Sequence, residues 1–204
     1  EELCPGGGLG IPYGPLEHSL PIESLVHAIA ARVEAGCARH QLPLPLLVLE
    51  PGRSIIGQAG VALYTVGSIK EIPGVRTYVS VDGGMADNPR PALYGAAYTG
   101  LLANRADESP GAPVTVAGKL CESGDVLIRD VPLPPPRPGD ILAVPASGAY
   151  QLAMSSNYNQ SLRPAAVLVA QSRTQLIQRR ETYADLVRRD IALRSGERGP
   201  AETG

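Results

Sequence analysis

A run of apolar residues, Leu46-Leu47-Val48-Leu49, ends at the turn Glu50-Pro51-Gly52-Arg53. A run this short and this apolar is typical of a strand that is buried on both faces. In parallel α/β sheets and barrels, the carboxyl ends of such strands gather the residues that do chemistry. The turn places an acid, a rigid proline, a glycine and a guanidinium at that end. We therefore expect a binding site there, although a structural salt bridge between the acid and the guanidinium would use the same residues.

A second turn of this kind, Gly6-Gly7-Gly8, follows a predicted strand end at Leu3-Cys4. Successive glycines expose backbone N–H groups that suit a phosphate, but they also form ordinary tight turns. Between the two turns, residues 21–40 show the spacing of an amphipathic helix. The strand–helix–strand order predicts a parallel α/β layer. The apolar face of that helix would consist of Ile22, Leu25, Val26, Ile29 and Val33.

From about residue 62 the pattern changes to short runs rich in Val, Ile, Leu and Thr, separated by Gly and Pro clusters. This predicts a mostly antiparallel β-sandwich or barrel. We expect residues 174–192 to form a helix and the polar, Gly-rich end, 195–204, to be frayed. The predicted strands are Val61 to Ile69, Arg76 to Asp82, Val114 to Leu120, Asp125 to Val131, Asp140 to Val144 and Pro164 to Ala170.

Composition removes several classes of function. Of the 204 residues, 44% are hydrophobic and 19% charged, which allows one or two domains with a real core. The net charge of -2 gives no reason to expect nucleic acid or an anionic membrane as partner, and no apolar run is long enough to span a bilayer. Trp and Phe are absent, which argues against an aromatic platform for bases. Cys4, Cys37 and Cys121 show no metal-site spacing, so a reducing cytoplasm is expected.

Three further elements carry side chains that suit a polar ligand. Arg90 and Tyr94 lie in a turn-rich segment, where a planar guanidinium can bind a carboxylate in bidentate fashion. Cys121 and Glu122 could supply a thiol proton donor beside a carboxylate for an amine. Tyr150 adds a hydroxyl after a predicted strand. Each has a plainer interpretation: a solvated arginine, a small core thiol and a packed aromatic ring.

Taken together and in order, these elements resemble the carboxyl-terminal half of the diaminopimelate decarboxylase family, which are pyridoxal-phosphate enzymes of the alanine-racemase-like fold type. The matching segments are GGGLGIPY at 6–13, EPGRSI at 50–55, VDGGMADNPRPALYGA at 81–96, GKLCESGD at 118–125, GAYQLAMSSNYN at 148–159 and RRETYADLV at 179–187.

The resemblance implies an α/β plus all-β architecture. Residues 1–60 would be the last part of a pyridoxal-phosphate-binding (β/α)8 barrel. Residues 61–194 would be a β-barrel-like carboxyl-terminal domain, and residues 195–204 a disordered tail. It also implies a homodimer in which the Cys-Glu loop of one subunit completes the active site of the other. The reaction would be the decarboxylation of meso-diaminopimelate to L-lysine.

The resemblance also assigns roles to the candidate residues. Cys121 would donate the proton, and no metal is implied. The substrate would be held by Arg53, Arg90, Tyr94, Glu122 and Tyr150, with the distal carboxylate at Arg90 and Tyr94 and the distal ammonium at Glu122. Cofactor binding would fall to Gly7, Gly8, Glu50, Pro51, Gly52, Arg53 and Tyr150, with Glu50 at the pyridine nitrogen.

One departure from the family pattern concerns lysine. In this family the lysine that binds the cofactor covalently lies upstream in the barrel, whereas Lys70 and Lys119 lie in the β region here. We therefore expect the chain to be a fragment of a longer enzyme and to be inactive by itself. The alternatives are a decarboxylase of ornithine, arginine or carboxynorspermidine, and a non-catalytic homologue that acts as an interaction module.

Overall fold

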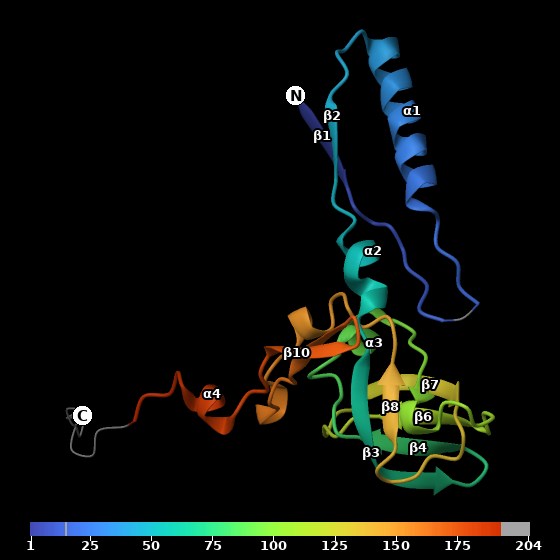
Figure 1. Cartoon of the computed structure of the whole chain (residues 1–204), viewed down its shortest axis with the longest axis vertical. Coiled ribbons are helices and arrows are strands. Elements are labelled where there is room, and N and C mark those ends of the chain that lie inside the picture. The colour runs from blue at the N-terminus through green and yellow to red at the C-terminus, as the bar shows by residue number, and fades with distance from the viewer. Residues whose placement is uncertain (15, 193–204) are drawn as a thin grey trace, which may run out of the picture. The chain divides into compact units, whose positions relative to one another are not determined.

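The computed structural model describes residues 1–14 and 16–192. The chain divides into two compact units, Glu1–Ser156 and Asn157–Gly204, which we describe separately. Figure 1 shows the order of the elements along the chain. No helix within the described ranges has both the length and the apolar character needed to cross a membrane.

The first unit begins with a parallel strand pair. β1 (Glu2–Gly6) pairs with β2 (Leu46–Leu49), and the helix α1 (Ile22–His40) connects them. The helix follows Pro21, has Glu23 in its first turn and is capped at its carboxyl end by Gln41, whose backbone is left-handed. The predicted strand–helix–strand unit is thus confirmed. The predicted burial of β2 is wrong for the residues the structure describes: Leu46 is 62% exposed, because β1 alone pairs with this strand.

A six-stranded sheet forms the rest of this unit, in the order β5-β8-β3-β4-β6-β7. β4 and β6 run parallel and the other neighbours antiparallel, so the mostly antiparallel β region expected from the sequence is confirmed. The strands are β3 (Ala62–Ile72), β4 (Arg76–Val81), β5 (Leu101–Leu102), β6 (Pro113–Ala117), β7 (Val126–Pro132) and β8 (Ile141–Val144).

Short helices fill the connections around this sheet. α2 (Gly52–Ile56) follows β2, and α3 (Arg90–Tyr94) lies between β4 and β5. The 3-10 helices are η1 (Gly57–Ala59), η2 (Ala103–Arg105), η3 (Leu152–Met154) and, in the second unit, η4 (Tyr158–Gln160).

The hydrophobic core lies on one face of the six-stranded sheet. Side chains two positions apart point to the same face of a strand. Val79 and Val81 of β4 are buried on this face, as are Val114 and Val116 of β6. Tyr98 belongs to the same core, and Tyr13 packs against it from the segment after β1. The core therefore reaches from the sheet to the segment that follows the amino-terminal glycine turn.

A buried acid closes the loop before β8. The Asp140 carboxylate accepts hydrogen bonds from Arg137 N–H (2.8 Å), Asn104 Nδ2 (3.0 Å) and Arg105 Nη1 (3.0 Å). Burial alone raises the pKa of Asp140, but these hydrogen bonds outweigh it and hold the pKa below its ordinary value. The ionised form therefore stabilises the fold.

The second unit contains a hairpin and a short helix. β9 (Ala166–Ala170) pairs antiparallel with β10 (Arg173–Gln178) through Gln171 and Ser172, which both have left-handed backbones, as a type I′ turn requires. The helix predicted over 174–192 is therefore wrong in its first part, because pairing with β9 overrides the helical spacing of the apolar residues. Only α4 (Tyr183–Val187) is helical, and a capping box of Thr182 and Asp185 starts it. The predicted frayed tail, 195–204, lies outside the described residues.

The amino-terminal elements leave apolar surface uncovered. α1 has no buried residue, and Leu42, Leu44 and Leu46 are each more than 60% exposed. We expect the isolated chain to self-associate or to be partly molten, because exposure of a large contiguous apolar patch to water is unfavourable. Light scattering and thermal unfolding check this. A monodisperse monomer with one sharp cooperative transition would contradict the prediction.

The Asp140 hydrogen bonds predict a pH dependence of stability. Because the folded-state pKa is lowered, their contribution is present above the unfolded pKa of about 3.9 and is lost as the pH falls through the folded value. The variant Asp140→Asn should be less stable than the wild type near neutral pH, and the difference should shrink toward pH 3. Urea unfolding at several pH values measures it. A pH-independent difference would show that the charge of Asp140 does not matter.

Candidate functional site

The parallel pairing of β1 and β2 brings the two predicted turns together. Glu50 N–H donates to the Gly6 carbonyl oxygen at 3.1 Å, directly after the last paired residues of both strands. A Cβ at Gly7 would lie 2.0 Å from the Glu50 carbonyl oxygen, so only glycine fits there. The glycine turn and the Glu-Pro-Gly-Arg turn therefore form one edge of the first unit.

This edge has room for a ligand. A Cβ added at Gly8 or at Gly52 would meet no atom within 4 Å. Gly8 also has a left-handed backbone (φ +70°), so a ligand can come close to the main chain there. The Glu50 side chain is exposed, and its carboxylate has no hydrogen bond or ion pair with any residue that the structure describes. Backbone and acid are thus both open to a partner.

Tyr150 lies beside two guanidinium groups at this edge. The Arg53 Cζ is 5.6 Å from the centre of the Tyr150 ring, and the Arg90 Cζ is 5.9 Å from it. The segment before Tyr150 is fixed to the end of α2, since Gly148 N–H donates to the Gly57 carbonyl at 2.9 Å. Tyr150 itself has a left-handed backbone (φ 63°), a conformation that costs a non-glycine residue roughly 1–3 kcal/mol and is typical of functional sites.

Arg90 is the most constrained residue of the site. It is only 7% exposed, and its Nη1 donates to the hydroxyls of Tyr13 (2.7 Å) and Tyr98 (2.8 Å). Burial alone lowers the pKa of Arg90, but the interactions with these two tyrosines outweigh it and raise the pKa. Within the described ranges, no carboxylate lies within 4.0 Å of this guanidinium. The first unit therefore buries a positive charge that has no acidic partner among the described residues.

The local sequence explains where Arg90 lies. Pro89 precedes α3 and Pro91 occupies its first turn, which suits a helix start. Gly95, in a left-handed conformation, ends the helix after little more than a turn. The Asn88 side chain accepts the Arg90 N–H at 3.3 Å.

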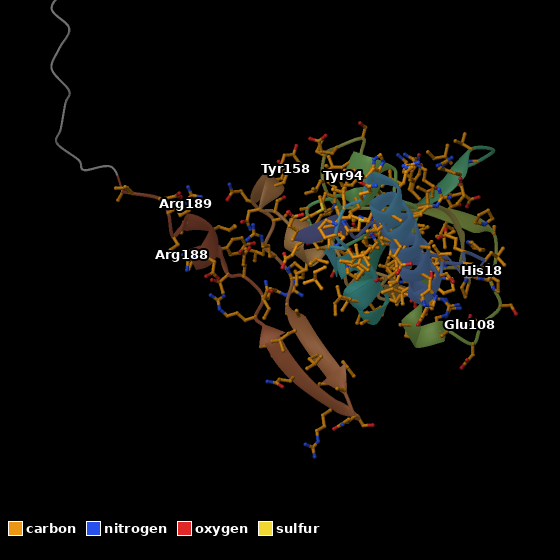
Figure 2. All side chains as sticks on the ribbon, turned by 90° about the horizontal axis from the view of Figure 1, so that it is seen from above. His18, Tyr94, Glu108, Tyr158, Arg188 and Arg189 are labelled. Atoms are coloured by element: carbon orange, nitrogen blue, oxygen red, sulfur yellow. The ribbon has the colours of Figure 1, made fainter. Side chains whose placement is uncertain are left out.

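Tyr13 and Tyr98 are site residues that the sequence interpretation missed. Tyr98 is buried, and the two rings pack edge to face with centres 5.2 Å apart. Tyr is the only aromatic residue type in the chain, and Tyr13 follows the glycine turn closely, so a signal was present. Tyr94, which was chosen instead, is 67% exposed and lies at the surface of the first unit (Figure 2). Its role as a ligand group remains a prediction.

A buried carboxylate connects the Arg90 segment to the turn that carries Cys121 and Glu122. Asp125 is 2% exposed and accepts hydrogen bonds from Met85 N–H (2.6 Å) and Leu120 N–H (2.7 Å). Its own N–H donates to the Glu122 carbonyl at 3.1 Å and closes the turn. Cys121 is exposed on this turn. Asp125 therefore determines how the turn and the Arg90 segment lie relative to each other.

Glycines surround the Asp125 carboxylate. A Cβ at Gly84 or Gly118 would lie 2.4 or 2.2 Å from its oxygens, so both positions must remain free of a side chain. The sequence interpretation assigned no role to Asp125, although its position after Cys-Glu-Ser-Gly is visible there.

Comparisons with known proteins now give this arrangement a family. The family model described as the C-terminal sheet domain of pyridoxal-dependent decarboxylases matches residues 28–148. The chain therefore belongs to the pyridoxal-dependent decarboxylases.

Several similar proteins and solved structures are diaminopimelate decarboxylases. The Synechocystis enzyme is 52% identical over 93% of this chain and 40% of its own length, and the Bacillus subtilis enzyme is 48% identical over 94% and 44%. A structure from M. jannaschii in complex with L-lysine has a TM-score of 0.83 at 39% identity, covering 95% of this chain and 43% of that one. This chain thus spans less than half the length of these relatives.

The Asp125 arrangement makes a prediction about stability. Asp125→Ala should lower the free energy of unfolding by about 2–4 kcal/mol, because two buried N–H groups lose a charged acceptor. Asp107→Asn, at an exposed position, is the control and should change it by less than about 0.5 kcal/mol. Equal stability of the Asp125→Ala variant and the wild type in urea unfolding would refute the assignment.

Proposed function

We propose that the protein containing this chain is a diaminopimelate decarboxylase, a carbon–carbon lyase that converts meso-2,6-diaminopimelate to L-lysine and carbon dioxide with pyridoxal 5'-phosphate. This is the last step of lysine biosynthesis. The observation that carries the proposal is the buried Arg90 guanidinium without an acidic partner among the described residues. A buried unpaired charge costs several kcal/mol unless a ligand of opposite charge relieves it. The high identity to the curated relatives supports the same reaction.

The residues present fit the cofactor. Gly7, Gly8, Pro51 and Gly52 form the turns at one edge, where the backbone at Gly8 and Gly52 faces open space and can receive a phosphate. Arg53, stacked near Tyr150, adds a positive charge for the same group. The Glu50 carboxylate is suited to keep a pyridine nitrogen protonated, because an opposite charge favours the charged form. When bound, the cofactor supplies the electron sink that decarboxylation needs.

The substrate would be held by charge complementarity. In this proposal Arg90 and Tyr94 bind the distal carboxylate, with Arg53 as a further cation, and Tyr150 touches cofactor and substrate. Glu122 accepts the distal ammonium, and the Cys121 thiol donates the proton that replaces carbon dioxide. Ornithine and arginine have no distal carboxylate and would leave Arg90 unpaired. We therefore favour diaminopimelate over these substrates.

The proposal includes the domain organisation expected from the sequence. Residues 1–60, with β1, α1 and β2, would be the last part of a cofactor-binding (β/α)8 barrel, and residues 61–194 the carboxyl-terminal domain. The parallel strand–helix–strand unit supports the first assignment. The three thiols are free, which supports a reducing cytoplasm as the compartment.

Substrate specificity tests the proposal. The complete gene product that contains these residues should release carbon dioxide and form lysine from diaminopimelate, and should prefer it to ornithine. Arg90→Met should lower kcat/KM for diaminopimelate by roughly 30-fold or more, because one partner of a buried charge pair is lost, and should not lower ornithine turnover. Arg129→Met, at an exposed position of β7, is the control.

Two outcomes would contradict the proposal. A preference for ornithine would assign the protein to the diamine-forming decarboxylases. Cofactor binding without any turnover would favour a non-catalytic interaction module.

We also propose that the active site is shared between two subunits of a homodimer, with Cys121 and Glu122 completing the partner's site. The exposure of Cys121 on its turn supports this. The variants Arg90→Ala and Cys121→Ser should each be inactive alone. After mixing and reassociation, about a quarter of the wild-type activity should return, because half of the dimers then contain one intact site. No recovery, despite subunit exchange seen by native mass spectrometry, would place both groups in the same subunit's site.

A further inference from the structure

We propose that Tyr13 and Tyr98 are positioning residues that determine which edge of the Arg90 guanidinium receives the substrate carboxylate. They occupy Nη1, so the carboxylate must approach the edge formed by Nε and Nη2. This inference rests on the proposed function, in which Arg90 binds a distal carboxylate, and it adds the source of the selectivity.

The number of donors supports this. A guanidinium has five N–H groups, two on each terminal nitrogen and one on Nε. Nη1 donates to the Tyr13 hydroxyl at 2.7 Å and to the Tyr98 hydroxyl at 2.8 Å, which uses both of its N–H groups. Nε and Nη2 form no hydrogen bond with any residue that the structure describes. They are a parallel pair of donors, the arrangement that binds a carboxylate in bidentate fashion.

The two hydroxyls are held rigidly. Tyr98 is 7% exposed within the core of the sheet, and its ring meets the Tyr13 ring at 81°. Tyr13 packs against the same core, and its N–H donates to the Glu17 carboxylate at 2.9 Å. Both rings also lie beside the Arg90 guanidinium, with centres 5.1 and 5.8 Å from Cζ. Rotation of Arg90 would therefore break two hydrogen bonds and two ring contacts at once.

The acceptors are also neutral, and this matters for selectivity. An Asp or Glu in place of either tyrosine would pair with Arg90 and cancel its charge. A phenol hydroxyl accepts an N–H group and leaves the positive charge available for a ligand. The site thus orients Arg90 without neutralising it, and a substrate that lacks the distal carboxylate gains nothing from it.

The test uses the complete gene product loaded with its cofactor and the variants Tyr98→Phe and Tyr13→Phe. Tyr78→Phe is a matched control, because its ring lies 5.9 Å from the Arg76 Cζ while Arg76 donates to Thr115 instead. One readout is the Kd of pimelate, a dicarboxylate of the same chain length that has no amine, measured by calorimetry. The other is KM and kcat for diaminopimelate and for ornithine.

We expect each of the two site variants to raise the Kd of pimelate and the KM for diaminopimelate about tenfold, which corresponds to the loss of one hydrogen bond to a charged group. The kcat, the cofactor absorbance and ornithine turnover should stay within about twofold of the wild type, as should every value for Tyr78→Phe. A merely structural role would lower the turnover of both substrates together.

The inference is overturned if wild-type protein does not bind pimelate, if both variants bind it as tightly as the wild type does, or if Tyr78→Phe shows the same loss. If one of the two variants does not fold, the pimelate Kd of the other variant tests the inference. Failure of the proposed function is a separate result: the wild type would then bind pimelate with the expected variant effects but would not turn over diaminopimelate.

Discussion

Arg90 keeps its positive charge although only 7% of its surface is exposed to water. The other parts of the site make this possible. Burial of a guanidinium costs desolvation free energy. A neighbouring carboxylate would offset part of that cost, but it would also neutralise the charge that a ligand needs. Two phenol hydroxyls and three aromatic rings stabilise the cation and leave its charge available. The buried sheet core supplies one of these tyrosines, and the segment after the first glycine turn supplies another. The core and the ligand site therefore depend on the same packing.

Two backbone arrangements determine where the other candidate groups lie. The parallel pairing of β1 with β2 aligns the glycine turn with the Glu-Pro-Gly-Arg turn, and the Glu50 N–H bond to Gly6 closes them against each other. The Asp125 carboxylate holds the Cys121 turn against the Arg90 segment through two backbone N–H groups. Side chains with chemical roles are thus carried by turns, while strands and one buried acid determine where the turns lie. The left-handed backbone of Tyr150 is consistent with this. The strained conformation occurs at the site, and the surrounding sheet stabilises it.

The sequence allowed the chain order of most elements and the neighbourhood of the two turns to be predicted, because these depend on local periodicity and on strand direction. It did not reveal the hairpin of β9 and β10, since the apolar residues from Leu176 to Ile191 suggest one helix and only pairing with β9 makes the first of them part of a strand. The burial of β2 was also predicted wrongly, because burial depends on which elements cover a strand and not on its composition. Arg90 was identified from its chemistry, but its partners Tyr13 and Tyr98 are distant in sequence and meet only through the fold. Tyr94 was named for its hydroxyl in the same turn-rich segment, and a local segment says nothing about contacts across the core.

The single parallel pair in the large sheet, β4 with β6, explains why this site exists where it does. Antiparallel neighbours can be joined by a tight hairpin, but parallel neighbours require the chain to return to the starting end of the sheet through a crossover. In this protein the crossover is the whole stretch from residue 82 to residue 112, and α3 with Arg90 lies within it. If β6 were antiparallel to β4, a two-residue turn would be enough to connect them. The chain would then contain no long connection in which α3 and Arg90 could lie. Strand direction thus creates the length of chain from which the recognition element is built.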